Sequence, residues 1–143
     1  MTLATRPPSD RAVVLFDGDC RFCTQQTRKL VRWFPRAVVA RNFQEPGALD
    51  AFPGITHEAC MKRMHLVTTK GAVYAGAEAG ARIVILGLPV LGLAFWLYYV
   101  PGVRQLAELL YGVIARYRYR IAGKTVRCDP GGTCHLHDGS APP

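Results

Sequence analysis

Apolar and polar residues alternate along the first part of the chain in a way that predicts a strand, a helix and a second strand. "AVVLF" (Ala12–Phe16) is a short apolar run closed by Asp-Gly, which predicts a buried strand ending in a sharp turn. From Cys20 to Pro35 apolar residues return every three or four positions, as on one face of a helix. "AVVARNF" (Ala37–Phe43) then predicts a second strand.

The next segment predicts a short helix, a hairpin and a longer helix. Thr56 is placed to cap a helix that runs through Arg63. Met64–Thr69 and Ala72–Ala75, joined by a Lys-Gly turn, predict a β-hairpin. A helix is expected from about Ala77, so the predicted order is βαβαββα.

The segment Ile83–Val100 contains no charged residue and approaches the length of a membrane span. Gly87, Pro89 and Gly92 interrupt it, which favours two core helices. Val103–Tyr119 follows as an amphipathic helix with leucines on one side, and we expect its arginines to face outward. Tyr98, Tyr99 and the flanking arginines leave peripheral membrane contact as an alternative.

Composition and charge are those expected of one folded domain. The chain has 143 residues, of which 50% are hydrophobic, and a formal net charge of +8. Basic residues concentrate between Arg104 and Arg127, which we interpret as a solvated helix face. Nucleic acid, an anionic membrane surface or an acidic protein are the alternatives for such a stretch, but no nucleic-acid-binding module is recognisable. "MTLATRPPSDR" lacks the apolar region of a secretory signal, so we expect a cytoplasmic protein, with membrane association as the alternative. Cysteines in that compartment are more often catalytic or metal-binding than structural.

Cys20 and Cys23 stand where the first strand meets the first helix. A thiolate at a helix start is stabilised by unpaired N–H groups and by the helix dipole, so Cys20 is the predicted exposed nucleophile and Cys23 the resolving thiol. Asp17 has two interpretations: a proton acceptor for Cys23, or a residue that only shapes the turn. Asp19 is the expected helix cap, and Gly18 allows the tight backbone path.

The stretch "FDGDCRFC", with "MHLVTTKGAVYAGAEA" and "LYGVIARYRYRIAG", resembles the DCC family of thiol-disulfide oxidoreductase-like proteins. The Asp and two Cys of the family name match Asp17, Cys20 and Cys23. The resemblance implies a thioredoxin-like three-layer α/β fold with a small central β-sheet and extra C-terminal helices. It also implies dithiol/disulfide chemistry without an organic cofactor, on protein or low-molecular-weight thiol or disulfide substrates, regenerated by a reductant such as the thioredoxin or glutathione system.

Thioredoxin-type enzymes dock substrates with a cis-proline before the third strand, and this chain has none there. The segment is "CMKRMHLV", in which His65 is the nearest residue that could replace the proline. A single histidine in a strand is more often simply packed.

The C-terminal segment carries further cysteines and histidines in a Pro/Gly-rich context. Cys128 and Cys134 could form a second redox pair, or, with His135 and His137, bind zinc, alone or together with Cys20 and Cys23. We divide the chain into a disordered segment 1–11, a domain 12–123 and a flexible tail 124–143. The predicted function is thiol–disulfide exchange; the alternatives are a metal-handling module and a membrane-surface or partner-binding protein.

Overall fold

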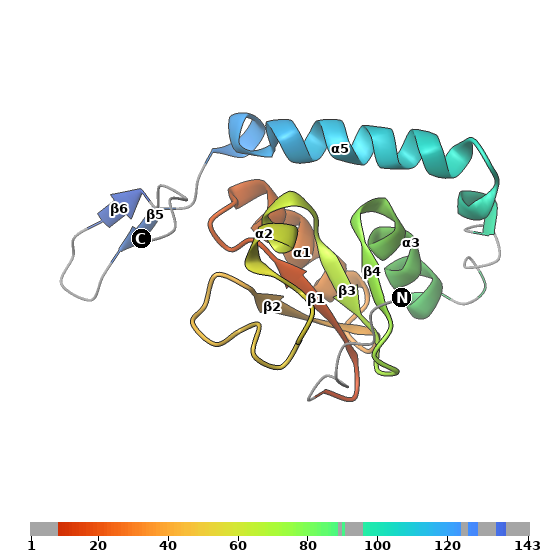
Figure 1. The fold of residues 1–143 in the computed structure, drawn as a ribbon, viewed down its shortest axis with the longest axis horizontal. Helices are drawn as coiled ribbons and strands as arrows, with labels where there is room; N and C mark the ends of the chain where they lie inside the picture. The colour runs from red at the N-terminus through yellow and green to blue at the C-terminus, as the bar shows by residue number, and fades with distance from the viewer. Residues whose placement is uncertain (1–8, 89, 91–95, 124–125, 129–133, 137–143) are drawn as a thin grey trace.

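A four-stranded mixed sheet forms the centre of the molecule. The computed structural model describes residues 9–88, 90, 96–123, 126–128 and 134–136. The strands are β1 (Ala12–Phe16), β2 (Val38–Asn42), β3 (His65–Val67) and β4 (Val73–Ala75), arranged in the order β2-β1-β3-β4 (Figure 1). β1 pairs parallel with β2, whereas β3 is antiparallel to both β1 and β4. Asp17 directly follows β1, which is an inner strand of this sheet.

The two faces of the sheet carry separate apolar cores. Helices α1 (Arg21–Trp33) and α3 (Gly76–Gly87) pack on one face, against a core that includes Val14, Leu66 and Ile83. Helix α2 (His57–Lys62) and the loop that precedes it pack on the other face, through Leu15, Phe52 and Cys60 among others. Alternate residues of β1 enter opposite cores, as a strand buried on both faces requires. The result is the predicted three-layer, thioredoxin-like α/β fold.

The elements predicted from the sequence are confirmed as far as α3. The Thr56 hydroxyl accepts a hydrogen bond of 3.2 Å from the N–H of Ala59, which is the expected N-cap of α2. The long apolar segment is broken, because α3 ends at Gly87 and a short 3₁₀ helix, η1 (Trp96–Tyr99), follows. In the part of the chain that the structure describes, no helix is long and apolar enough to cross a bilayer.

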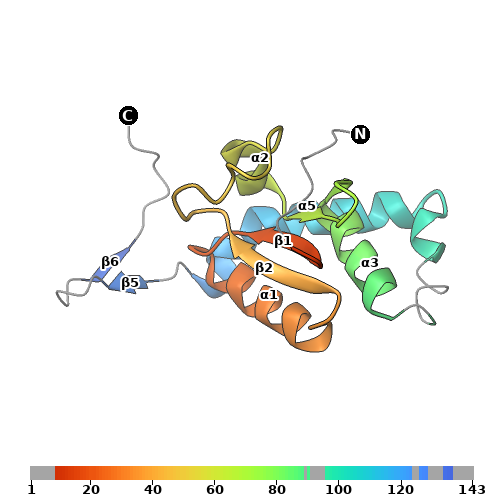
Figure 2. The ribbon, with the colours of Figure 1, turned by 90° about the horizontal axis from the view of Figure 1, so that it is seen from below.

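Helix α5 (Val103–Ala122) lies across the body (Figures 1 and 2). The side of the helix that we expected to face outward is the side that packs against the body. Arg118, predicted to face outward, is 6% exposed. The face turned away from the body is apolar, and we call it the α5 outer face; it comprises Leu106, Leu109, Leu110, Val113, Tyr117 and Ile121. The prediction was wrong because polar groups of the body bind α5, so its polar side is the one that packs.

Two further short strands follow α5. β5 (Val126–Cys128) and β6 (Cys134–Leu136) pair antiparallel, in a segment for which the sequence predicted a flexible tail. Both views show this hairpin apart from the four-stranded sheet.

Candidate functional site

The CxxC pair sits where β1 meets α1, and Cys20 itself caps the helix. Cys20 has an extended backbone, and its Sγ accepts a hydrogen bond of 3.2 Å from the N–H of Cys23. Asp19, the cap expected from the sequence, lies one residue before the cap. The sulfur of Cys20 therefore does what an Asp or Ser oxygen usually does at a helix start.

Gly18 allows the tight approach of β1 and β2 that fixes this junction. Its N–H donates to Asn42 Oδ1 at 2.9 Å. A Cβ at this position would lie 2.3 Å from Asn42 Nδ2, a distance that real Cβ atoms do not show. A residue with a Cβ at position 18 would therefore have to displace the Asn42 side chain, which binds the N–H of Gly18.

The pKa values of the two thiols of the pair are shifted in opposite directions. A hydrogen bond from the Cys23 side chain lowers the pKa of Cys20 to about 7, against the opposing effect of burial. The same hydrogen bond, together with burial, raises the pKa of Cys23 far above the ordinary thiol value. Near neutral pH a large part of Cys20 is therefore thiolate, whereas Cys23 keeps its proton.

The expected exposure of Cys20 is wrong. Cys20 is 0% exposed and Cys23 is partly buried; both are free thiols. A helix cap is turned back toward its own first turn, which hides the sulfur of Cys20. Any molecule that reacts with that sulfur can reach it only when the surrounding chain moves.

Helix α5 supplies a guanidinium to the pair. Arg118 Nη1 donates to Cys23 Sγ at 3.4 Å, and its Nη2 lies 3.2 Å from Asp17 Oδ2. Nη2 also donates to the carbonyl of Met61 at 2.7 Å. A buried cation next to Cys23 favours the thiolate form of that residue once its proton is lost.

Asp17 is held by four donors from three parts of the chain. Its Oδ1 accepts from Asp19 N–H at 3.0 Å and from Gln44 Nε2 at 3.1 Å. Its Oδ2 accepts from the Tyr119 hydroxyl and faces Arg118. Asp17 thus reaches Cys23 through the guanidinium of Arg118, and its role as a proton acceptor stays a prediction.

Arg118 and Tyr119 are site residues that the sequence analysis did not identify. They lie about a hundred residues after the CxxC pair, and no motif spacing links them to it. The sequence analysis took the leucines of this helix as its buried side, and therefore predicted that Arg118 faces solvent. Burial and a hydrogen bond to Asp17 raise the pKa of Tyr119, so its hydroxyl keeps its proton and remains a donor.

An apolar cavity of about 230 Å³ opens beside Cys23. Side chains from α1 and α5, together with Phe16, Cys60 and Met64, form its walls, and Arg118 and Asp17 lie at its polar end. Burial raises the pKa of Cys60 to about 11, so this thiol is a neutral apolar wall residue. The cavity has room for a small apolar group next to the sulfur.

The backbone that carries a cis-proline in thioredoxin-type enzymes is bound here by α5. Met64, which precedes β3, donates its N–H to the hydroxyl of Tyr111 at 2.8 Å. His65 is buried, and its Nδ1 lies 2.9 Å from the carbonyl of Arg63. His65 is therefore a packed residue, and the N–H of the residue before it is bound by the Tyr111 hydroxyl of α5.

The predicted second redox pair lies in the C-terminal hairpin. The register of β5 and β6 sets Cys128 opposite Cys134, and Arg127 opposite His135. His137 lies outside the described residues. Among the side chains that the structure describes, no three His, Cys, Asp or Glu residues are grouped as a metal site. The relay and zinc interpretations of this segment both stay predictions.

Comparison with known proteins gives one family and one curated relative. A model of the DCC1-like thiol-disulfide oxidoreductase family matches residues 14–124. An uncharacterized chloroplastic protein of Arabidopsis thaliana (At5g50100) is 25% identical over 126 residues, which cover 83% of this chain and 56% of the relative. The chain thus spans little more than half the length of that relative. No solved structure matches.

Proposed function

The chain belongs to the DCC1-like thiol-disulfide oxidoreductase family, and from this premise we propose that it exchanges disulfides through Cys20 and Cys23. One observation carries the proposal: Cys20 caps α1, with its Sγ 3.2 Å from the N of Cys23, and a hydrogen bond from the Cys23 side chain lowers the pKa of Cys20 and raises the pKa of Cys23. Nucleophilic attack needs a thiolate, and the resolving thiol must keep its proton until the first step is complete.

In the first step Cys20 attacks one sulfur of a substrate disulfide. A bond forms between Cys20 Sγ and that sulfur, the substrate S–S bond breaks, and the leaving thiolate takes a proton from solvent. The Cys20 thiolate is consumed, so the hydrogen bond that held the proton on Cys23 is lost.

In the second step Cys23 loses its proton to solvent and attacks Cys20 Sγ. The Cys20–Cys23 bond forms, the mixed disulfide bond breaks, and the second substrate sulfur leaves as a thiolate that takes a proton from solvent. The substrate has gained two electrons and the dithiol has lost two. Arg118, at 3.4 Å from Cys23 Sγ, stabilises the thiolate formed in this step, and Asp17 holds Arg118 in place. A thiol reductant, such as glutathione or a thioredoxin, completes the cycle by reducing the new disulfide.

The cavity beside Cys23 supports a substrate with an apolar group next to its disulfide. Its walls are mainly apolar, and its volume of about 230 Å³ suits a single small group. Because Tyr111 occupies the N–H of Met64, the main-chain docking used by thioredoxin-type enzymes is closed while α5 stays in place. Low-molecular-weight disulfides therefore fit the site better than an extended peptide.

Trapping tests the proposed reaction. In a Cys23→Ser variant the second step is blocked, so a mixed disulfide should accumulate on Cys20 when a small aromatic disulfide is added, as seen by intact-mass and peptide analysis. The double variant Cys20→Ser with Cys23→Ser is the matched control, because it lacks the proposed nucleophile and should form no adduct at this pair. The proposal is wrong if Cys20→Ser retains turnover, or if the trapped adduct lies on another cysteine.

A further inference from the structure

The α5 outer face is a continuous apolar surface that nothing in the described structure covers. Its residues recur every three or four positions from Leu106 to Ile121, and Leu109 is 65% exposed. A helix of 20 residues is about 30 Å long, so the surface runs for most of that length. Folded proteins seldom leave so large an apolar patch in water unless it binds something.

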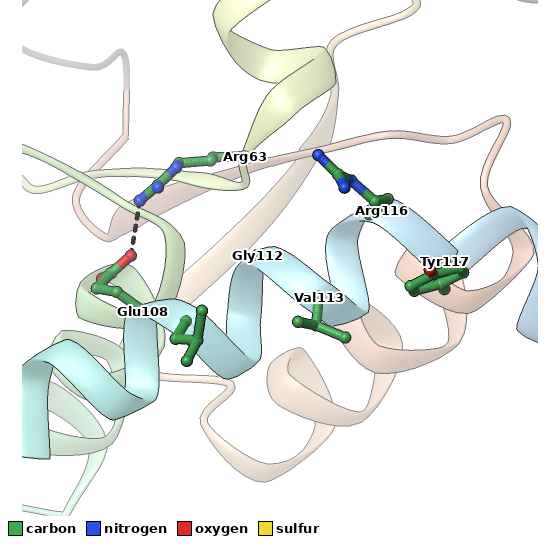
Figure 3. Close-up of a pocket in the computed structure, with 7 residues that line it drawn as sticks. Arg63, Glu108, Gly112, Val113, Arg116 and Tyr117 are labelled. Atoms are coloured by element: carbon green, nitrogen blue, oxygen red, sulfur yellow. Dashed lines mark hydrogen bonds and ion pairs between the residues drawn. The ribbon is translucent and has the colours of Figure 1, made fainter.

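A charged groove runs beside this apolar surface. It has a volume of about 580 Å³ and is bounded by Arg63, Glu108, Gly112 and Arg116, with apolar side chains of the α5 outer face at its edge (Figure 3). Glu108 is the only carboxylate of α5, and Arg63 Nη1 pairs with it at 2.6 Å. Arg116 and Arg120 are exposed, and within the described residues neither has a carboxylate partner. The groove and its rim therefore present uncompensated positive charge next to an apolar surface.

We propose that the α5 outer face binds the surface of bilayers that contain anionic phospholipid. The helix would lie in the plane of the interface, with its leucines among the acyl chains and with Arg116 and Arg120 against headgroup phosphates. Trp96 of η1, which is 67% exposed just before α5, is a residue type enriched at that depth.

Charge decides between a bilayer and a second copy of the chain. In a pair of α5 helices the two arginines would need carboxylates across the interface, but the only one on α5 is already bound to Arg63. An anionic bilayer supplies phosphates along the whole helix, and the net charge of +8 on the chain adds a long-range attraction.

Vesicle flotation of the full chain tests this proposal. We compare vesicles of phosphatidylcholine alone with vesicles that also contain about a quarter phosphatidylserine. The chain should float with the anionic vesicles, bind phosphatidylcholine at least about 10-fold more weakly, and dissociate from the anionic vesicles as salt is added.

Matched variants separate the apolar and the charged contributions. Leu109→Gln should weaken binding to anionic vesicles about 10-fold, whereas Leu86→Gln, which changes an exposed leucine on α3, should not. Arg116→Gln combined with Arg120→Gln should weaken it about 10-fold or more. Lys70→Gln, in the turn between β3 and β4, removes a charge far from α5 (Figure 1) and should have little effect. Circular dichroism checks that each variant is folded.

Three results would overturn the proposal. The first is equal binding to both kinds of vesicle, and the second is no binding to either. The third is a dimer, detected by light scattering, that Leu109→Gln dissociates without any vesicle binding, because the α5 outer face would then be an interface between copies.

Discussion

Two identical side chains, three residues apart, are made chemically different by their positions at the start of one helix. Cys20 caps α1, so its sulfur accepts hydrogen bonds from the N–H and from the thiol of Cys23. Cys23 lies one turn further on, where its thiol is the donor to Cys20 and its sulfur accepts a hydrogen bond from Arg118. The division of roles that we propose, with Cys20 as nucleophile and Cys23 as resolving thiol, thus follows from which residue comes first.

The Cys23 thiol should therefore control the pKa of Cys20. Cys23→Ala removes the donor, and the Cys20 pKa should rise from about 7 toward the ordinary value of 9.0. Cys23→Ser keeps a hydroxyl donor and should retain most of the shift. The measurement is a titration of thiolate ultraviolet absorbance, taken as the difference from the same chain with Cys20→Ser. Equal pKa values in the two Cys23 variants would contradict this assignment.

At the scale of elements, the sequence predicted the sheet and the helices around it but not how α5 docks. Local patterns determine β1, α1 and the hairpin, because each is short and bounded by turn residues such as Gly18. Cys20, Cys23 and Asp17 were also predicted, since a strand-to-helix junction can be identified from sequence alone. The inward face of α5 could not be predicted from the sequence. Tyr111 and Arg118 bind groups far away in the chain, and leucines on a helix normally indicate its buried side.

Docking of α5 should control access to the dithiol. Tyr111→Phe removes the hydrogen bond to Met64 N–H, which contributes about 1 kcal/mol, so α5 should detach about 5-fold more often. Alkylation of the dithiol under reducing conditions should become faster by a similar factor. Tyr117→Phe, on the exposed side of the same helix, is the control. An unchanged alkylation rate in Tyr111→Phe would mean that another segment limits access.

On the scale of the whole molecule, the buried thiols couple folding to pH in opposite directions. Cys20 has a folded pKa of about 7, below the ordinary 9.0, so its contribution to the free energy of unfolding is present above pH 9 and is lost as the pH falls through 7. Cys60 has a folded pKa of about 11, so its contribution to the same free energy is complete below pH 9 and is lost as the pH rises through 11. Cys23, with a raised pKa, acts in the same direction as Cys60.

The free energy of unfolding of the reduced chain should therefore rise between pH 7 and 9 and fall above that range. The rise should be on the order of 1 to 2 kcal/mol. Urea denaturation at a series of pH values, with a reductant present, measures it. Cys20→Ser should lose the rise and keep the fall. If Cys20→Ser shows the same rise in the free energy of unfolding, the rise comes from another titratable group.

The cap formed by Cys20 has a consequence for the motion of the backbone. A thiolate accepts a charge-assisted hydrogen bond from Cys23 N–H, whereas a sulfur in a disulfide carries no charge and accepts only weakly. Oxidation of the pair thus removes most of the capping energy and leaves the first turn of α1 easier to open. We therefore expect the amide hydrogens of that turn to exchange with solvent faster in the oxidised chain, so that the chemical state of one sulfur becomes a difference in backbone dynamics.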